Sequence, residues 1–463
     1  MADTYLENTS QGTPTSTKIG TISVWMKMNY QDGPSIISNF SDSSNRIYFR
    51  VLNTGQLYIF GKVGGSTNVQ LQTVALLRDS SAWYHIVVAY DTTQVTDTDR
   101  IKLYINGGNY VWDAAGGTTY PAQDAVIRFN GEDNLNIGRR FDGTHKDPFD
   151  GYMTEFIFID GTQYAASDFG ETDSTSGIWV PKLAPSVTYG DNGYHLKFEN
   201  SGASAAAGNF GSDSSGNDNH LTSYNLGSHP NTTDTPQNNF CTGNPLSNFY
   251  EQAVYTKGNL KVQSDTAGSS NAYTAMSANT ALKAGKWYWE MYIDNEAAEI
   301  STGITPYITS SDTQWVGAQL YSYGYYTNGV LYNNSSSTAF GDSYTTGDTI
   351  SFGVDLTNSK LYIAKNGVWQ NSGDPAAGTN GFAIASVATV AASTSTTYPH
   401  VGGYQPSWSE QTSHTNSTIS WNFGNPVSAI TSSNADDAGY GNFEYDVPAG
   451  FYAVCTQNLA TYG

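Results

Sequence analysis

The chain has 463 residues, of which only 13% are charged, and its formal net charge is −21. Binding nucleic-acid phosphates requires clustered lysine and arginine, and no basic run is present, so we expect no nucleic-acid partner. No apolar run is long enough for a membrane-spanning helix, so we expect no membrane insertion. The first residues include Asp3 and Glu7 and lack a basic start, so no secretory signal is expected.

The composition is rich in glycine and tyrosine, with 47 Gly and 33 Tyr. Short β-branched and aromatic segments alternate with clusters of Gly, Asn, Ser and Asp, and long amphipathic helical runs are absent. This pattern is typical of sandwiches and barrels, so we predict an all-β protein built from two jelly-roll-type sandwiches. Surfaces rich in Tyr, Asn and Ser are suited to adaptable recognition, and the alternative is a stable shell without a ligand.

Residues 1–183 are predicted to form the first sandwich. Eight strands with polar turns between them fit a jelly roll. We expect them at 21–28, 36–40, 46–52, 56–62, 83–91, 100–107, 135–140 and 151–161. The segments WYHIVVAYD (83–91), RIKLYING (100–107) and FDGYMTEFIFIDG (149–161) follow one another as in the laminin-G and pentraxin group of concanavalin-like sandwiches, which this domain resembles.

Residues 184–254 are rich in Asn, Gly, Ser and Asp and contain few apolar residues. We predict an ordered but irregular connector with a strand or two, and disorder is the alternative because the apolar content is low. The apolar anchors of this segment are Tyr194, Leu196, Phe198, Leu221 and Phe240.

Residues 255–463 are predicted to form the second sandwich, with a closing strand and turn in the tail. In GKWYWEMYID (285–294), apolar and polar residues alternate at period two, as they do in TISFGVDL (349–356). These strands, the Asn366-Gly367 turn and YPHVGGY (398–404) resemble a SPRY domain, which implies a module that binds partners through its loops and does not catalyse. The expected strands are 259–265, 286–294, 300–306, 322–332, 349–356, 360–367, 398–404 and 417–424.

The order of the two sandwiches, with DTPQNNFCTGNPL (234–246) between them and PAGFYAVCTQNL (448–459) at the end, resembles structural proteins of marine tailed phages. This resemblance implies a protein on the exterior of a virion, in a tail fibre or tip or in a capsid appendage. Its expected partners are other virion proteins and a host cell-surface glycan or protein. Fibre proteins are often oligomeric, so we expect a homo-oligomer, although no trimerisation element is present.

No catalytic constellation is visible in the sequence, so we expect a protein that is not an enzyme. Some concanavalin-like sandwiches are glycosidases with three alternating carboxylates on one strand. Here Glu290 and Asp294 share a face, but Tyr292 replaces the central acid. Residues i and i+4 on a strand also lie more than twice as far apart as the roughly 5 Å that retaining glycosidases need. The alternatives are a purely structural decoration or cementing subunit and, less favoured, a polysaccharide depolymerase.

Three carboxylates cluster before a predicted strand in RFDGTHKDPFDG (140–151), and they are Asp142, Asp147 and Asp150. Loop carboxylates hold Ca²⁺ in related sandwiches, so a calcium site is one interpretation, with Asp32, Asp42 and Asp133 as further candidates from other loops. The spacing matches no fixed ligand pattern, and Asp-Gly turn chemistry explains it equally well.

Aromatic side chains in loop-like surroundings are the candidate contact surface of the second domain. Aromatic faces stack on sugars, and neighbouring Asn and Asp bond to hydroxyls. The alternatives are a strand in which half of these tyrosines are buried, and a subunit interface. The candidate residues are Tyr321, Tyr323, Tyr325, Tyr326, Trp315, Trp369 and Trp408.

Three further residues are assigned structural roles from their sequence context. His85 lies inside a predicted strand and is interpreted as a core residue whose hydrogen bonds are satisfied. Cys241 and Cys455 match no metal-ligand spacing, and two buried free thiols are favoured over a disulfide between them.

Overall fold

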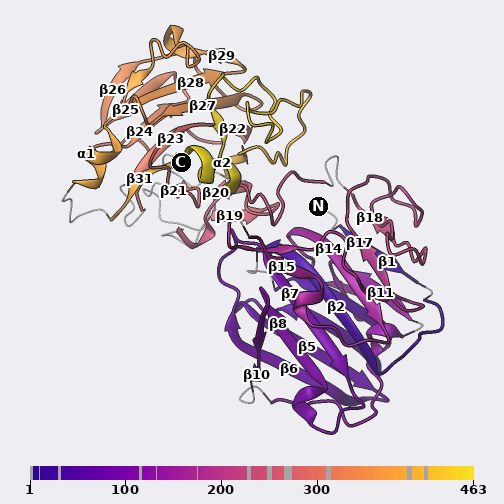
Figure 1. Ribbon diagram of the computed structural model, residues 1–463. Coiled ribbons are helices and arrows are strands. Elements are labelled where there is room, and N and C mark those ends of the chain that lie inside the picture. Colours follow the sequence, from indigo (N-terminus) through magenta and orange to yellow (C-terminus); the bar gives the residue numbers. More distant parts are fainter. Residues whose placement is uncertain are drawn as a thin grey trace. The chain divides into compact units, whose positions relative to one another are not determined.

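The computed structural model divides the chain into two compact units, Met1–Asn231 and Thr232–Gly463. Both units are built from antiparallel sheets, which confirms the predicted all-β class (Figure 1). Within the part of the chain that the structure describes, no helix has the length and apolar character needed to cross a membrane. The described residues are 4–9, 11–29, 33–113, 117–131, 133–174, 176–226, 231–247, 253–264, 274–308, 314–393, 399–410 and 416–463.

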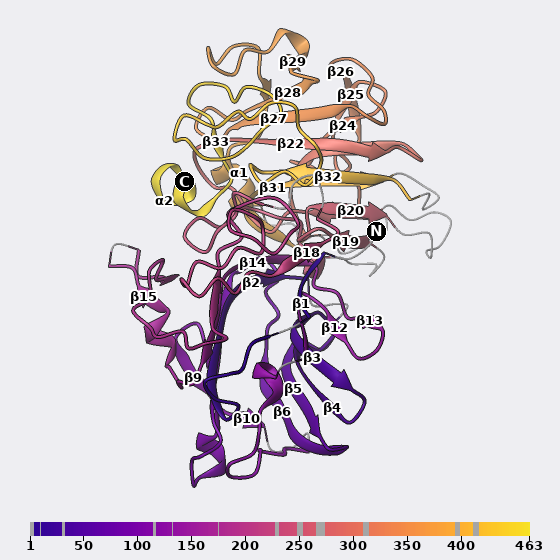
Figure 2. The same ribbon diagram turned by 90° about the vertical axis from the view of Figure 1, so that its right-hand side faces the viewer.

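The first unit is a sandwich of two sheets, which appear as separate layers in Figure 2. The larger sheet has eight strands, in the order β10 (Trp112–Asp113), β6 (Ser66–Leu76), β5 (Gln56–Val63), β4 (Asn45–Val51), β3 (Ser35–Asp42), β11 (Asn134–Ile137), β1 (Tyr5–Asn8) and β18 (Thr222–Tyr224). The smaller sheet has six, in the order β17 (Tyr194–Leu196), β14 (Gly151–Asp160), β2 (Ile19–Met28), β7 (Tyr84–Asp91), β8 (Ile101–Ile105) and β9 (Gly108–Tyr110).

Two short strand pairs and several single helical turns complete this unit. The pairs are β12 (Arg140–Phe141) with β13 (His145–Lys146), and β15 (Gly170–Thr172) with β16 (Trp179–Pro181). The short 3₁₀ turns are η1 (Asp97–Asp99), η2 (Arg128–Asn130) and η3 (Ala166–Asp168).

All eight strands predicted for the first domain are present, but the long strand β6 was missed. Its period-two pattern places Val69 and Leu71 in the core while Gln70 and Gln72 face outward. Gly61 on the neighbouring β5 lies on the inward face, where an added Cβ would come within 2.9 Å of the Val69 side chain. Close approach of these two strands therefore requires glycine at this position.

The described residues of the predicted connector pack against the two units and do not form a separate part of the molecule. Its first section joins the first unit, because Tyr194, Leu196 and Leu221 are buried in that core. Its last section joins the second unit, where Phe240 packs in a small core cluster. The division at residue 231 therefore replaces the predicted three-part organisation.

The second unit also contains two sheets. The larger follows the order β19 (Ala253–Thr256), β20 (Lys261–Ser264), β32 (Thr418–Asn422), β22 (Lys286–Asn295), β27 (Thr349–Asp355), β28 (Lys360–Lys365) and β29 (Val368–Trp369), with β30 (Phe382–Ala383) on β28 and β33 (Tyr452–Ala453) on β22. The smaller follows the order β21 (Thr274–Ser277), β31 (His400–Glu410), β23 (Ile300–Tyr307), β24 (Tyr323–Tyr326), β25 (Val330–Asn333) and β26 (Ser336–Ala339). Helical segments are η4 (Pro245–Ser247), η5 (Gln370–Ser372), α1 (Val387–Ala391) and α2 (Thr456–Tyr462).

Three details of this unit refine the predictions. The single strand expected at 322–332 is a hairpin of β24 and β25, because Gly329 turns the chain with a φ of 84°. The Asn366-Gly367 turn is present, with both residues at positive φ. The tail contains the expected short strand, β33, and also the helix α2, which was not predicted.

The two cysteines are buried and free, as expected. Burial raises the pKa of the Cys455 thiol to about 11, so this group is a protonated thiol at neutral pH.

Candidate functional site on the outer face of the larger sheet

The outward side of strands β4 to β6 in the first unit carries aromatic, basic and amide side chains, and we call this surface the outer face. Strand alternation produces it, because Ile47, Phe49 and Ile59 point into the core at 2% exposure or less. Their neighbours along β4 and β5 are partly exposed on the opposite side. These outward residues are Arg46, Tyr48, Arg50, Tyr58, Phe60 and Lys62.

Three rings form the centre of the outer face, and we call Tyr48, Tyr58 and Phe60 the aromatic platform. Tyr48 lies directly opposite Phe60 in the β4–β5 ladder, and Gln72 lies opposite Tyr58 on β6. The ring centroids are 5.4 Å apart for Tyr48 and Phe60 and 6.2 Å apart for Tyr48 and Tyr58. Because two ladders fix their spacing, the rings need little reorganisation to meet a flat ligand.

Partial burial keeps the phenols of the platform neutral. Desolvation raises the pKa of Tyr48, and desolvation together with the neighbouring Tyr48 raises the pKa of Tyr58 to about 12. At physiological pH each hydroxyl therefore can donate one hydrogen bond and accept others.

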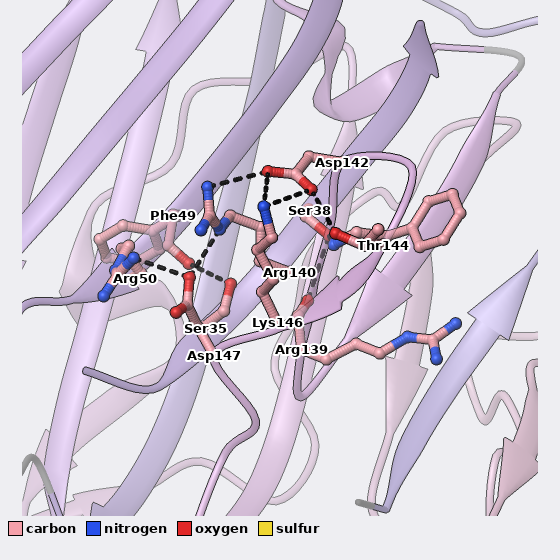
Figure 3. A network of polar contacts seen from close by, with 11 residues as sticks. Ser35, Ser38, Phe49, Arg50, Arg139, Arg140, Asp142, Thr144, Lys146 and Asp147 are labelled. Atoms are coloured by element: carbon pink, nitrogen blue, oxygen red, sulfur yellow. Dashed lines mark hydrogen bonds and ion pairs between the residues drawn. The ribbon is translucent and has the colours of Figure 1, made fainter. Parts of the chain in front are cut away.

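A network of ion pairs borders the platform (Figure 3). The Asp147 carboxylate accepts from Arg50 Nη1 at 2.7 Å and from Arg140 Nε at 2.6 Å. Arg140 also pairs with Asp142 at 3.2 Å, and Lys146 Nζ lies 3.2 Å from the same carboxylate. The Arg140 guanidinium lies 5.0 Å from the Tyr48 ring centroid, which joins the network to the platform through a cation–π contact.

Backbone contacts hold this network against strand β3. Ser38 Oγ donates to the Arg139 carbonyl at 3.1 Å (Figure 3). It also accepts from the Phe141 amide at 3.2 Å. The Ser35 amide donates to the Asp147 carbonyl at 2.9 Å. The hairpin of β12 and β13 is therefore fixed by main-chain bonds at both ends of the network.

Two of the three carboxylates considered for calcium, Asp142 and Asp147, are paired with cations of the protein itself. Burial opposes ionisation of Asp142, but Lys146, Arg140 and Thr144 outweigh it and lower the pKa of that carboxyl. Asp150 lies just before β14, where its carbonyl accepts from the Asn29 amide. The described residues contain no cluster of three or more acidic, His or Cys side chains suited to a metal ion. The residues present therefore do not fit a calcium site.

The other acidic candidates for calcium have local partners as well. Asp42 accepts from the Ser44 amide at 2.6 Å and from the Asn45 side chain, as in an Asp-capped turn. Asp133 forms an ion pair with Arg128, and Asp32 lies outside the described residues.

Most of the aromatic side chains proposed for contact in the second domain are buried. Tyr323, Tyr325 and Tyr326 form strand β24 and are exposed by 5% or less, and Trp408 on β31 is fully buried. Their assignment to a ligand surface is wrong, because the pattern belongs to a strand that is covered on both faces. The remaining candidates are partly exposed, and they are Tyr321, Trp315 and Trp369.

These remaining aromatic residues are separated from one another by the fold. Trp315 packs edge-on against Tyr326 and Tyr332. Trp369 belongs to the other sheet, in β29, and packs edge-on against Tyr288 and Tyr362. The second unit therefore does not assemble the predicted group of residues into one surface.

Glu290, the residue considered for a depolymerase, is 2% exposed and holds the C-terminal segment in place. Its carboxylate accepts from the amides of Glu444 at 3.0 Å and Tyr445 at 2.8 Å. The Tyr288 hydroxyl and the Asn422 side chain also donate to it, each at 3.0 Å. Burial raises the pKa of Glu290 although all four donors act in the opposite direction. Asp294 is engaged elsewhere, by Lys261 and Ser420.

His85 is a fully buried core residue, as expected. It stacks on Trp25 with ring centroids 4.6 Å apart, and Trp179 Nε1 donates to its Nδ1 at 3.0 Å. The ring proton therefore resides on Nε2, which lies 2.9 Å from Ser23 Oγ. Desolvation lowers the pKa of His85 to about 3.

Comparisons with known proteins assign both units to families. Residues 2–167 match the model of the concanavalin A-like lectin/glucanases superfamily, and residues 286–393 match the SPRY domain model. The chain thus carries a concanavalin-like domain followed by a SPRY domain, as the sequence resemblance indicated. No curated protein was found with a matching sequence.

Solved structures with similar folds cover parts of the chain. A human SPRY domain aligns with 37% of this chain and 94% of its own at 18% identity and a TM-score of 0.26. A structure described as a putative carbohydrate binding protein from Bacteroides ovatus aligns with 48% of this chain and 55% of its own, at 15% identity and a TM-score of 0.30. The CBM40 domain of a Ruminococcus gnavus sialidase, bound to sialyllactose, aligns with 32% of this chain and 86% of its own at 17% identity and a TM-score of 0.23.

Proposed function

We propose that this chain, a concanavalin-like domain followed by a SPRY domain, is a non-enzymatic protein that binds glycans through the aromatic platform. The family model of the first domain describes lectins as well as glucanases, which is compatible with this function. The observation that carries the proposal is the group of three partly exposed rings, Tyr48, Tyr58 and Phe60, on one sheet face.

The chemistry of the platform suits a sugar. The C–H faces of a pyranose ring stack on aromatic rings, and the hydroxyls at its rim require hydrogen-bond partners. The platform supplies both, because the hydroxyls of Tyr48 and Tyr58 are neutral and the outward amides of Gln70 and Gln72 lie on the next strand. An extended polysaccharide could run across several strands of this sheet.

We further propose that the protein is part of the exterior of a virion and contributes to host attachment. The basis is the resemblance of the two-domain order to structural proteins of tailed phages. In that setting the glycan would belong to the host cell surface, and other virion proteins would hold the chain, which we expect to be a homo-oligomer. Cryo-electron microscopy of a particle that contains the chain tests this location, and an outer face covered by neighbouring subunits would contradict the attachment role.

The binding function can be tested with the full chain on a glycan array, followed by calorimetry with the best ligand. We expect Tyr58→Ala and Phe60→Ala each to weaken binding at least about tenfold, because each removes a stacking surface. Tyr110→Ala is the matched control, since Tyr110 is a 41% exposed tyrosine of the same unit on the other sheet. Equal losses in all three variants, or none, would contradict a role for the platform.

Two other outcomes would favour the alternatives. Chain shortening of the bound polysaccharide by purified protein would indicate a depolymerase. Absence of binding to any glycan, together with particles that lose stability when the protein is removed, would indicate a structural subunit.

A further inference from the structure

Two cations stand directly opposite each other on the outer face. Arg46 on β4 is paired with Lys62 on β5 in the antiparallel ladder, one step along the strands from the Tyr48–Phe60 pair. Like charges at directly opposed positions repel and destabilise a sheet unless an anion lies between them. An anion bound between the two cations would relieve this repulsion.

The protein does not supply that charge within the described residues. Neither Arg46 nor Lys62 forms an ion pair there, whereas Arg50, Arg140 and Lys146 on the same unit share the carboxylates of Asp142 and Asp147. Arg140 and Lys146 are also directly opposed in a ladder, but those two cations share the Asp142 carboxylate.

The guanidinium of Arg46 is also placed for a ligand. Its Cζ lies 5.9 Å from the centroid of the Phe60 ring, at the edge of the platform. Arg46 is partly exposed at this position.

We infer that the outer face binds a carboxylated polysaccharide, one built from uronic acid residues. This inference rests on the proposed glycan binding and adds the class of sugar. A uronate ring would stack on Phe60 while its carboxylate meets Arg46 and Lys62. Carboxylate is the favoured anion because the planar guanidinium fork bonds its two oxygens at once, and the Lys62 ammonium adds a point charge.

The test uses the full chain with polygalacturonate, alginate and polyglucuronate, each beside its own methyl ester. Esterification removes the negative charge and leaves the sugar rings in place. We expect at least one acid to bind about tenfold or more tightly than its ester. In the Arg46→Gln/Lys62→Gln double variant this preference should disappear while the affinity for the ester stays within about twofold.

The double variant Arg78→Gln/Lys102→Gln is the control, because it removes the same charge from residues outside strands β4 to β6. It should keep the preference for the acid. Equal losses in both double variants would overturn the inference, since they would show a long-range effect of the chain's charge and not a contact at the outer face.

The remaining outcomes separate the two proposals. If acids and esters bind equally, glycan binding stands and the uronate inference fails. If no polymer binds in either form, the uronate inference fails, and the glycan array decides whether glycan binding by other sugars stands. If dextran sulfate binds as tightly as the best uronate polymer and loses as much affinity in the double variant, the site selects anions in general and the uronate inference fails.

Discussion

Tyrosines occur in β4 and β5 of the first unit and in β24 of the second unit. Those of β4 and β5 are partly exposed, and those of β24 are buried. Tyr48 and Tyr58 contact one another and Phe60 and stay partly exposed. Tyr325 is enclosed by Phe340 and Tyr344, and its hydroxyl donates to the Asp342 carbonyl. Alternation identifies a strand, but the outward side of that strand becomes a surface only where no other segment covers it.

The largest effect expected from this comparison is the loss of a buried ring in the second unit. Tyr325→Ala should lower the free energy of unfolding by about 3–5 kcal/mol, because it leaves a cavity in a fully buried site. Glycan binding at the outer face should not change at temperatures where the variant is folded. Urea unfolding and calorimetry measure the two quantities. A Tyr325→Ala variant that stays stable but fails to bind glycan would contradict this assignment, because it would give Tyr325 a role in binding and not in the core.

A smaller loss is expected for Glu290→Gln. The four donors around Glu290 leave no place for an amide NH₂ group, because each carboxylate oxygen already accepts two hydrogen bonds. We expect a loss of about 2–4 kcal/mol of stability. Limited proteolysis should then cleave first in the segment that follows Asn422. Asp294→Asn is the control. A Glu290→Gln protein that is as stable as the native protein would contradict the anchoring role.

Acidification should weaken the first unit through His85. The pKa of this ring is about 3 in the folded state against 6.5 when unfolded, so the unfolded chain binds the extra proton. The stabilisation is complete above pH 6.5 and declines as the pH falls, by about 1.4 kcal/mol per unit, or about 2 kcal/mol at pH 5. The urea concentration at the midpoint of unfolding should be lower at pH 5 than at pH 6.5 in the native protein. His85→Phe should remove that part of the slope, and an unchanged slope would contradict it.

The smallest effect on stability is expected at the platform itself. Tyr58→Ala should cost less than about 1 kcal/mol, because the ring is partly exposed and packs mainly on other surface rings. The same variant should lose most of the glycan affinity. Comparison of its unfolding curve with its binding isotherm separates the two effects, and a stability loss near that of Tyr325→Ala would show that the platform is part of the core.

The sequence predicted the class of fold and most strands because period-two alternation is local information. It failed where the answer depended on contacts between distant segments. Tyr325 is buried because Phe340 and Tyr344 cover it, and the sequence of β24 alone does not predict these contacts. The partner of Asp147 was missed for the same reason, since Arg50 reaches it from a strand far away in sequence.

The outer face was missed although its signal was present. Arg46, Tyr48 and Arg50 alternate along one strand, and Tyr58, Phe60 and Lys62 alternate along the next. Paired as an antiparallel hairpin, these two triplets become a single surface. The register that brings Arg46 beside Lys62 depends on the turn between the strands, which the sequence pattern alone did not fix.

The outer face comes from consecutive strands of one meander, β4 to β6, in which core residues and surface residues alternate. Every second codon in this short stretch of the gene can therefore change without disturbing the interior. A population that carries single substitutions at these positions would sample new ligand preferences while keeping a folded protein. When the binding partners change, this arrangement of residues lets ligand specificity evolve faster than the fold.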